Sequence, residues 1–188
     1  LIAAGDGKSE KEMAAEVLSD YSSYHLDVQE IVIDDSSLKS SSEDTADQDR
    51  EDDRLGSYPL VFLDTEENMT DLIIVISDEP DIADEIVAEE IKEYIERNFA
   101  DLTDKDIIIP INDSEEIEDA TEHDAIIIGN PYVNPEVNTL YNRYDFEQDH
   151  PEGEGLIKYY QTDDKVQIIV AAMESEDLRD AARVMQMP

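Results

Sequence analysis

The chain has 188 residues, of which 51 are Asp or Glu and only 13 are Lys or Arg, so its formal net charge at pH 7 is -38. A surface this acidic repels nucleic-acid phosphates and anionic lipids, which excludes both as expected partners. Hydrophobic residues still make up 40% of the chain and cysteine is absent, so we expect a folded core without disulfide or thiolate chemistry.

The first part of the chain predicts a strand, a helix and a second strand. LIAAG at residues 1–5 and EIVIDD at residues 30–35 are apolar runs of strand length, and SEKEMAAEVLSDYSSY at residues 9–24 has helical periodicity. Residues 36–57 are rich in Ser, Asp and Glu and nearly free of large apolar side chains. Such a segment buries too little to offset its ordering entropy, so we expect an acidic exposed loop there.

The middle of the chain alternates between strand-like and helix-like patterns of apolar residues. We expect strands at residues 59–65, 71–77 and 107–111, a long helix at 81–99, and a short helix at 114–120 capped by Ser114. The run at residues 71–77 is almost wholly aliphatic, which is typical of a strand covered on both faces.

The last third ends in a hairpin and a helix. We expect a strand at residues 125–129, a short helix at 135–142 behind Asn134, strands at 155–161 and 165–173, and a final helix at 175–185 capped by Ser175. Together these elements predict an α/β fold: a mixed, largely parallel sheet flanked by helices on both faces, with a C-terminal β-hairpin and helix.

Residues 1–188 are expected to form a single α/β domain. Because the chain begins at Leu1 rather than Met, we expect that it is a fragment of a larger protein. No apolar run approaches the roughly 20 residues that cross a bilayer, so we expect no direct membrane insertion within this chain.

The acidic residues are spread over helices and loops. Charge of this density destabilises the compact state at physiological salt, where the screening length is about 8 Å, and molar salt shortens that length to about 3 Å. We therefore expect a halophilic source. An acidic tail or a calcium-buffering protein is the alternative, and both usually carry their charge in blocks.

Two glycine turns between a strand and a helix invite comparison with phosphate-binding loops. GDGKSE at residues 5–10 ends like a P-loop, but Ile2 stands where the first glycine is required. The turn at Gly129 lacks the other glycines of a dinucleotide fingerprint, and Pro131 and Pro135 remove amide donors. Both turns are better interpreted as corners between elements, and we predict no cofactor.

Neither metal nor catalytic residues stand out. DQDRED at residues 47–52 alternates acids like an EF-hand loop, and the candidate ligands are Asp47, Asp49, Glu51 and Asp52. Asp52 occupies the place of the obligatory glycine, so we expect at most diffuse binding of Ca²⁺ or other cations. The three histidines (His25, His123 and His150) lack zinc-ligand spacing, and no serine belongs to a nucleophile motif, so we nominate no catalytic residue.

Two tripeptides match the N-glycosylation pattern, at Asn68 and at Asn112. Both fall in predicted turns, where a glycan can be accommodated. This favours a location outside the cell.

Residues 106–185 carry an ordered set of motifs: IIIGNPYVNPEV, then GLIKYYQ, then KVQIIVAAMESEDLRDAARVM. This region resembles the C-terminal signature of archaeal S-layer proteins of the methanococcal type. The matching positions are Gly129, Pro131, Asn134, Pro135, Gly155, Ala171, Ala172, Glu174, Glu176, Asp177, Arg179, Ala181 and Ala182. Asn130, Met173 and Leu178 depart from the family pattern.

The resemblance implies a secreted structural glycoprotein that tiles a cell envelope through lateral contacts with itself or other envelope proteins, without catalysis. The signature also has a physical interpretation. Glu176 and Asp177 suit the first turn of a helix, Arg179 is expected to pair with a carboxylate, and the small Ala181 and Ala182 let the helix approach the sheet.

Two other functions remain open. The first is an intracellular halophilic α/β enzyme or small-ligand-binding domain that uses the strand ends near Gly5 and Gly129. The second is an adhesion module that binds its partner through a flat, uncharged patch.

Overall fold

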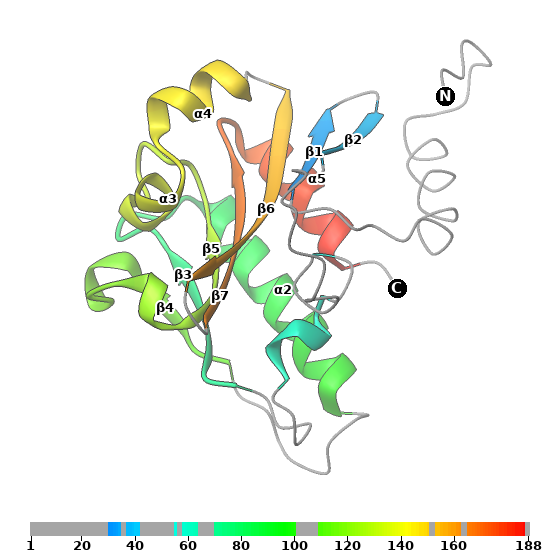
Figure 1. Cartoon of the computed structure of the whole chain (residues 1–188), viewed down its shortest axis with the longest axis vertical. Coiled ribbons are helices and arrows are strands. Elements are labelled where there is room, and N and C mark those ends of the chain that lie inside the picture. The colour runs from blue at the N-terminus through cyan, green and yellow to red at the C-terminus, as the bar shows by residue number, and fades with distance from the viewer. Residues whose placement is uncertain are drawn as a thin grey trace, which may run out of the picture.

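A single seven-stranded sheet organises the chain (Figure 1). The computed structural model describes residues 30–34, 37–41, 55, 58–63, 70–100, 109–150, 153–162 and 165–186. The strands are β1 (Glu30–Asp34), β2 (Ser37–Ser41), β3 (Leu72–Ile76), β4 (Ile111–Asp113), β5 (Asp124–Ile128), β6 (Glu154–Thr162) and β7 (Lys165–Ala172). Their order across the sheet is β2-β1-β6-β7-β5-β3-β4. The strand and helix predicted at residues 1–5 and 9–24 lie outside the described residues.

The sheet is mixed, which confirms the predicted α/β class. Neighbours β4, β3, β5 and β7 are parallel, whereas β7 pairs antiparallel with β6, β6 with β1, and β1 with β2. Strands β1, β3, β4, β5 and β7 therefore run in one direction, and β2 and β6 in the other. The β6–β7 pair is the hairpin expected at the C-terminal end.

The two faces of the sheet pack against different helices. One face meets the long α2 (Ile82–Ala100) and α5 (Ser175–Met185), which also contact each other. The other face packs against the buried Val137 of α3 (Pro135–Leu140) and the buried Phe146 of α4 (Arg143–Asp149). Every residue of β3 and β5 is buried, because alternate side chains of each strand enter the two apolar layers.

The strand predicted at residues 59–65 is wrong. The 3-10 helix η3 (Leu60–Phe62) occupies it, and Phe62 is fully buried among core side chains while Leu60 remains 55% exposed. Tyr58 stacks on Tyr94 of α2 with ring centroids 6.3 Å apart. A short apolar run has no period that separates a strand from a tight helical turn, and here packing against α2 decides the outcome.

The acidic loop predicted at residues 36–57 is wrong in two places. Ser37–Ser41 form β2, and Leu55 is 5% exposed and belongs to the core. An edge strand can form through backbone pairing with one neighbour, so β2 does not need the apolar side chains whose absence suggested a loop.

Several boundaries and caps also differ from prediction. Strand β4 begins at Ile111, where the predicted strand ended, and the helix expected at 114–120 is only a 3-10 turn, η4 (Ser114–Glu116). Asp113 and Glu174, rather than Ser114 and Ser175, occupy the N-cap positions. Helix α4 was not predicted, because its seven residues bury only Phe146 and so lack an apolar stripe.

Candidate functional site

A cavity of about 180 Å³ lies at the carboxyl ends of β3, β5 and β7. Its lining residues are Glu79, Asp81, Asp84, Asn130, Val133, Ala172, Met173, Glu174, Ser175 and Leu178. The chain leaving β3 and β7 enters α2 and α5 on one face of the sheet, whereas the chain leaving β5 enters α3 and α4 on the other. Divergent connections of this kind open the crevice in which α/β proteins commonly bind ligands.

Asp81 and Asp84 form a reciprocal cap at the start of α2. The Oδ1 atom of Asp81 accepts hydrogen bonds from the backbone N–H groups of Ala83 (2.6 Å) and Asp84 (3.0 Å). In return, Oδ2 of Asp84 accepts from the backbone N–H of Asp81 at 3.2 Å. This is a capping box built from two aspartates, and it satisfies three donors that the first helical turn leaves free.

Asp81 also links α2 to α5. Its Oδ2 accepts a 2.6 Å hydrogen bond from the hydroxyl of Ser175, which begins α5. Burial alone raises the pKa of Asp81, but the hydrogen bonds from Ser175, Asp84 and Ala83, with the charge of Arg179, outweigh it and hold that pKa below its ordinary value. Asp81 is therefore a satisfied anion that joins the beginnings of two helices.

Asp84 lies in the opposite situation. Its side chain is 4% exposed and lies beside the Gly129 turn: a Cβ on Gly129 would approach Oδ1 of Asp84 to 3.3 Å. Burial raises the pKa of Asp84 to about 6; the hydrogen bond from Asp81 opposes this, and the negative charges of Asp81 and Glu85 add to it. The cavity therefore contains a buried carboxyl group whose pKa its surroundings raise to about 6.

Hydrogen bonds of Gly129 and Asn130 stabilise the turn that follows β5. Gly129 has a φ of 125°, which L-residues rarely adopt, and its N–H donates to the Val170 carbonyl at 3.0 Å. Asn130 accepts from the N–H of Tyr132 at 2.8 Å and donates to the carbonyl of Met173 at 3.0 Å. These contacts tie the end of β5 to the end of β7.

Asn134 also stabilises this turn, and its side chain is fully buried. Its Oδ1 accepts from the N–H of Glu136 at 2.9 Å, and its Nδ2 donates to the carbonyl of Ile128 at 2.9 Å. The predicted Asn134 cap, with Pro135 in the first turn of the helix, is confirmed. Pro131 is buried within the turn.

The closing helix meets the sheet at Gly155. A Cβ there would lie 2.6 Å from the backbone carbonyl oxygen of Asp177 and 3.0 Å from Cβ of Ala181. Ala181 and Ala182 are fully buried, which confirms that small residues let this helix approach closely. The carboxylate of Asp177 accepts from the N–H of Gly153 at 3.0 Å and so anchors the start of β6.

Two other signature residues of α5 lie on its outer side. Glu176 is exposed in the first turn, as predicted. Arg179 is exposed and forms no ion pair with any carboxylate that the structure describes; its charge acts on Asp81 at longer range.

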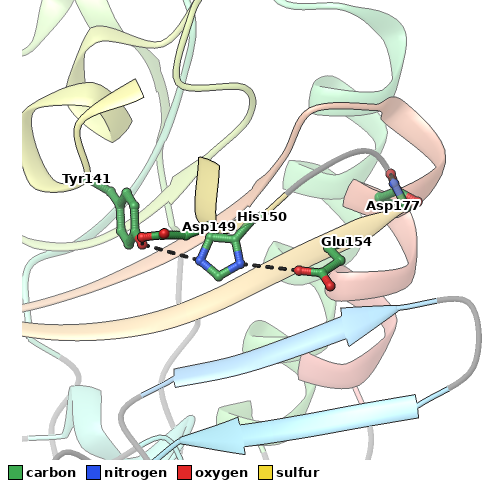
Figure 2. Close-up of polar contacts among 6 residues, drawn as sticks. Tyr141, Asp149, His150, Glu154 and Asp177 are labelled. Atoms are coloured by element: carbon green, nitrogen blue, oxygen red, sulfur yellow. Dashed lines mark hydrogen bonds and ion pairs between the residues drawn. The ribbon is translucent and has the colours of Figure 1, made fainter. Parts of the chain in front are cut away.

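His150 is the buried member of a polar cluster at the end of α4 (Figure 2). It is 3% exposed, and its ring lies between Tyr141, with 3.4 Å from Nε2 to the hydroxyl, and Glu154, with 3.7 Å from Nδ1 to Oε2. The Tyr141 hydroxyl donates to Asp149 at 3.0 Å. His150 is therefore not a solvated surface histidine, since Phe146 and Tyr141 enclose its ring.

The remaining predicted sites are not brought together. Asp47, Asp49, Glu51, Asp52, Asn68 and His25 lie outside the described residues. Asn112 lies in strand β4 rather than in a turn, because the strand starts later than predicted, and Ser114 of its tripeptide is 3% exposed. Within the described ranges, no three His, Asp or Glu side chains converge as a metal-ligand set.

Neither a scan of the chain against protein-family models nor a comparison with curated proteins finds a match. Among the described helices, none combines the length and the apolar character required to cross a membrane.

Proposed function

We propose that this chain is a non-enzymatic, extracellular structural domain of a halophilic archaeal cell surface, related to S-layer proteins. The observation that carries the proposal is that the side chains of the S-layer-like motif contact the chain's own backbone. Asn134 and Asp177 direct their polar groups to backbone atoms of the chain itself, and Gly155 admits the backbone of α5. Residues that stabilise the fold through internal contacts, without binding a ligand, are what a structural scaffold requires.

The contacts also explain why the signature residues occur in a fixed order. The Gly129 corner joins β5 to α3 and, through Asn130, to the end of β7. Gly155 and Asp177 then fix α5 against the neighbouring β6. The carboxyl ends of β5 and β7 and the amino end of β6 are thereby locked relative to one another. A rigid unit of this kind suits a lattice, in which small errors in geometry accumulate from copy to copy.

The charge supports an exterior location in strong salt. A net charge of -38 opposes contact between copies at low ionic strength, and this repulsion fades as salt shortens the screening length. Ca²⁺ and other cations held diffusely by the acids assist the same contacts. We further propose N-glycans at Asn68 and Asn112. Because Ser114 is buried in the fold, modification at Asn112 precedes folding.

Sedimentation velocity in molar KCl, with and without Ca²⁺, tests the proposal. We expect association that increases with protein concentration and with Ca²⁺, and no turnover of small substrates. A chain that stays monomeric at every concentration in both buffers contradicts the proposal. Matched ionic strength in the two buffers separates an effect of Ca²⁺ from simple screening.

A small-ligand-binding domain is the second candidate, and the cavity at the strand ends favours it. Its volume of about 180 Å³ lies below the roughly 300–1,000 Å³ of ordinary small-molecule and cofactor pockets. The cavity is therefore too small to enclose a nucleotide. A saturable rise in melting temperature in a titration with small metabolites that fit this volume would favour this candidate over the scaffold.

A further inference from the structure

Arg143 lies between two exposed tyrosine rings at the start of α4. Its guanidinium carbon is 5.0 Å from the ring centroid of Tyr144 and 5.6 Å from that of Tyr132, and the group donates to the Tyr144 hydroxyl at 3.3 Å. Tyr144 is 63% exposed and Tyr132 is 40% exposed. We call Tyr132, Arg143 and Tyr144 the α4 patch. It presents two aromatic surfaces with a positive charge between them.

The charge of Arg143 is not matched within the chain. Although the chain has 51 acidic residues, Arg143 forms no ion pair with any carboxylate in the part that the structure describes. Glu147, one helical turn further along α4, is bonded to the Tyr132 hydroxyl instead. Stacking on the rings orients the guanidinium group before a partner arrives, which lowers the entropy cost of binding a carboxylate. Tyrosine and arginine are also the residue types that dominate the energetics of protein interfaces.

A second exposed patch lies at the start of α2. Ile82 is 73% exposed and Ile86 is 38% exposed, and one helical turn separates them, so they are neighbours on the outer side of the helix. Glu85 is exposed beside them and forms no ion pair with a basic residue among the described ranges. We call Ile82, Glu85 and Ile86 the α2 patch. It presents apolar area together with an unpaired negative charge.

The two patches are complementary in both respects. We propose that the α4 patch of one copy of this chain binds the α2 patch of a second copy. Arg143 pairs with Glu85 of the second copy, and the two tyrosine rings pack against its exposed isoleucines. This inference rests on the proposed function, because it names the two surfaces that make one of the lateral contacts of a layer.

The position of the patches makes the contact head-to-tail. Helices α2 and α4 pack against opposite faces of the sheet, so the two patches of one copy cannot cover each other. Each copy bound through one patch keeps the other patch free, and a contact of this kind extends into rows of copies. A symmetric contact between two α4 patches would instead bring two unpaired guanidinium groups together.

Strong salt favours this contact. Repulsion between copies with a net charge of -38 acts over a distance and fades when molar salt shortens the screening length to about 3 Å. An ion pair that becomes partly buried in the contact is screened much less. A contact of two small patches is weak for a single pair of copies, and it gains strength in an array, where each copy makes several contacts at once.

Sedimentation equilibrium of the whole chain in molar KCl measures the association constant. Arg143→Glu and Glu85→Arg should each lower this constant about tenfold, because each places like charges opposite one another. The double variant with both changes restores opposite charges and keeps the net charge of the unmodified chain. Its association constant should return to within about twofold of the original value. An equimolar mixture of the two single variants should also associate more strongly than either alone.

Glu90→Arg is the matched control for Glu85→Arg, because Glu90 is exposed on the same helix, lies outside the α2 patch and gives the same change in net charge. Because it lowers the net repulsion, it should associate at least as strongly as the unmodified chain. Ile82→Gln changes a side chain that is 73% exposed and should weaken association several-fold without unfolding the chain. Circular dichroism establishes that each variant is folded.

The contact is refuted if Glu85→Arg associates as strongly as Glu90→Arg, or if the folded double variant fails to recover. If only Arg143→Glu weakens association, the α4 patch binds a different acidic surface and its pairing with the α2 patch is wrong. Should Arg143→Glu fail to fold, Ile82→Gln and the comparison of Glu85→Arg with Glu90→Arg decide the matter.

Failure of this contact and failure of the structural function remain distinguishable. A chain that associates in molar salt with an association constant that none of these changes alters contradicts the contact alone. A chain that associates through the two patches but lies inside the cell retains the contact and contradicts the cell-surface function. A chain that stays monomeric under every condition contradicts both.

Discussion

Replacing Gly155 by alanine tests the close contact between α5 and β6. A Gly→Ala change in a strand ordinarily stabilises a protein by about 0.4–1 kcal/mol, because it restricts the unfolded chain. Here the new Cβ would lie 2.6 Å from the carbonyl oxygen of Asp177, a backbone atom that cannot turn aside. Relieving the overlap moves α5 away from the sheet. Overpacking of this kind costs about 1–3 kcal/mol, so we expect net destabilisation.

Urea unfolding in molar KCl, followed by circular dichroism, measures the effect on the free energy of unfolding. Gly153→Ala is the control: nothing lies within 4 Å of its Cβ position, so its cost arises only from a φ of 89°. The Gly155→Ala variant should also lose protection from hydrogen exchange along α5, which the control should keep. If Gly155→Ala is as stable as the unmodified chain or more stable, the close-approach explanation of this signature glycine is wrong.

Three further outcomes are expected. The raised pKa of Asp84 means that the stability contributed by this group is present below pH 3.8 and lost as pH rises through about 6. Above pH 6, the Asp84→Asn variant should therefore be more stable than the unmodified chain, by up to about 3 kcal/mol. Below pH 3.8 the two should unfold with the same free energy, and urea unfolding across pH measures both. Asn134→Ala removes a buried cap and leaves the Ile128 carbonyl unpaired. In chemical denaturation this should lower the free energy of unfolding by about 2–4 kcal/mol. The control Thr139→Ala, at an exposed position, should lower it by about 0.5 kcal/mol or less. Dilution from molar to about 0.15 M salt should lower the melting temperature, and an unchanged value would contradict halophilic adaptation.

Local sequence signals predicted the C-terminal half of the fold. The Asn134-Pro135 pair marks the start of α3, and the hairpin β6–β7 follows from two apolar runs around a short polar turn. Helix α5 has a clear apolar stripe. Two further signals were available: Asp81 and Asp84 stand three residues apart as a capping box, and Asn142 precedes α4, where it accepts from the N–H of Tyr144.

The cavity could not be predicted from local patterns. It draws on residues 79–84, 130–133 and 172–178, which only the strand order β7-β5-β3 brings together. The same holds for the contact between Asp81 and Ser175, which are 94 positions apart. Strand β2 escaped prediction for a different reason: its stability depends on backbone pairing with β1, which leaves no apolar pattern.

The structural function is tested most directly by where the protein lies in the cell that makes it. Immunogold labelling of intact, unpermeabilised cells, imaged by cryo-electron tomography in the native salt, locates the chain relative to the membrane. The account predicts label on the outer surface at the regular spacing of a layer. Label that appears only after permeabilisation, distributed through the cell interior, contradicts it.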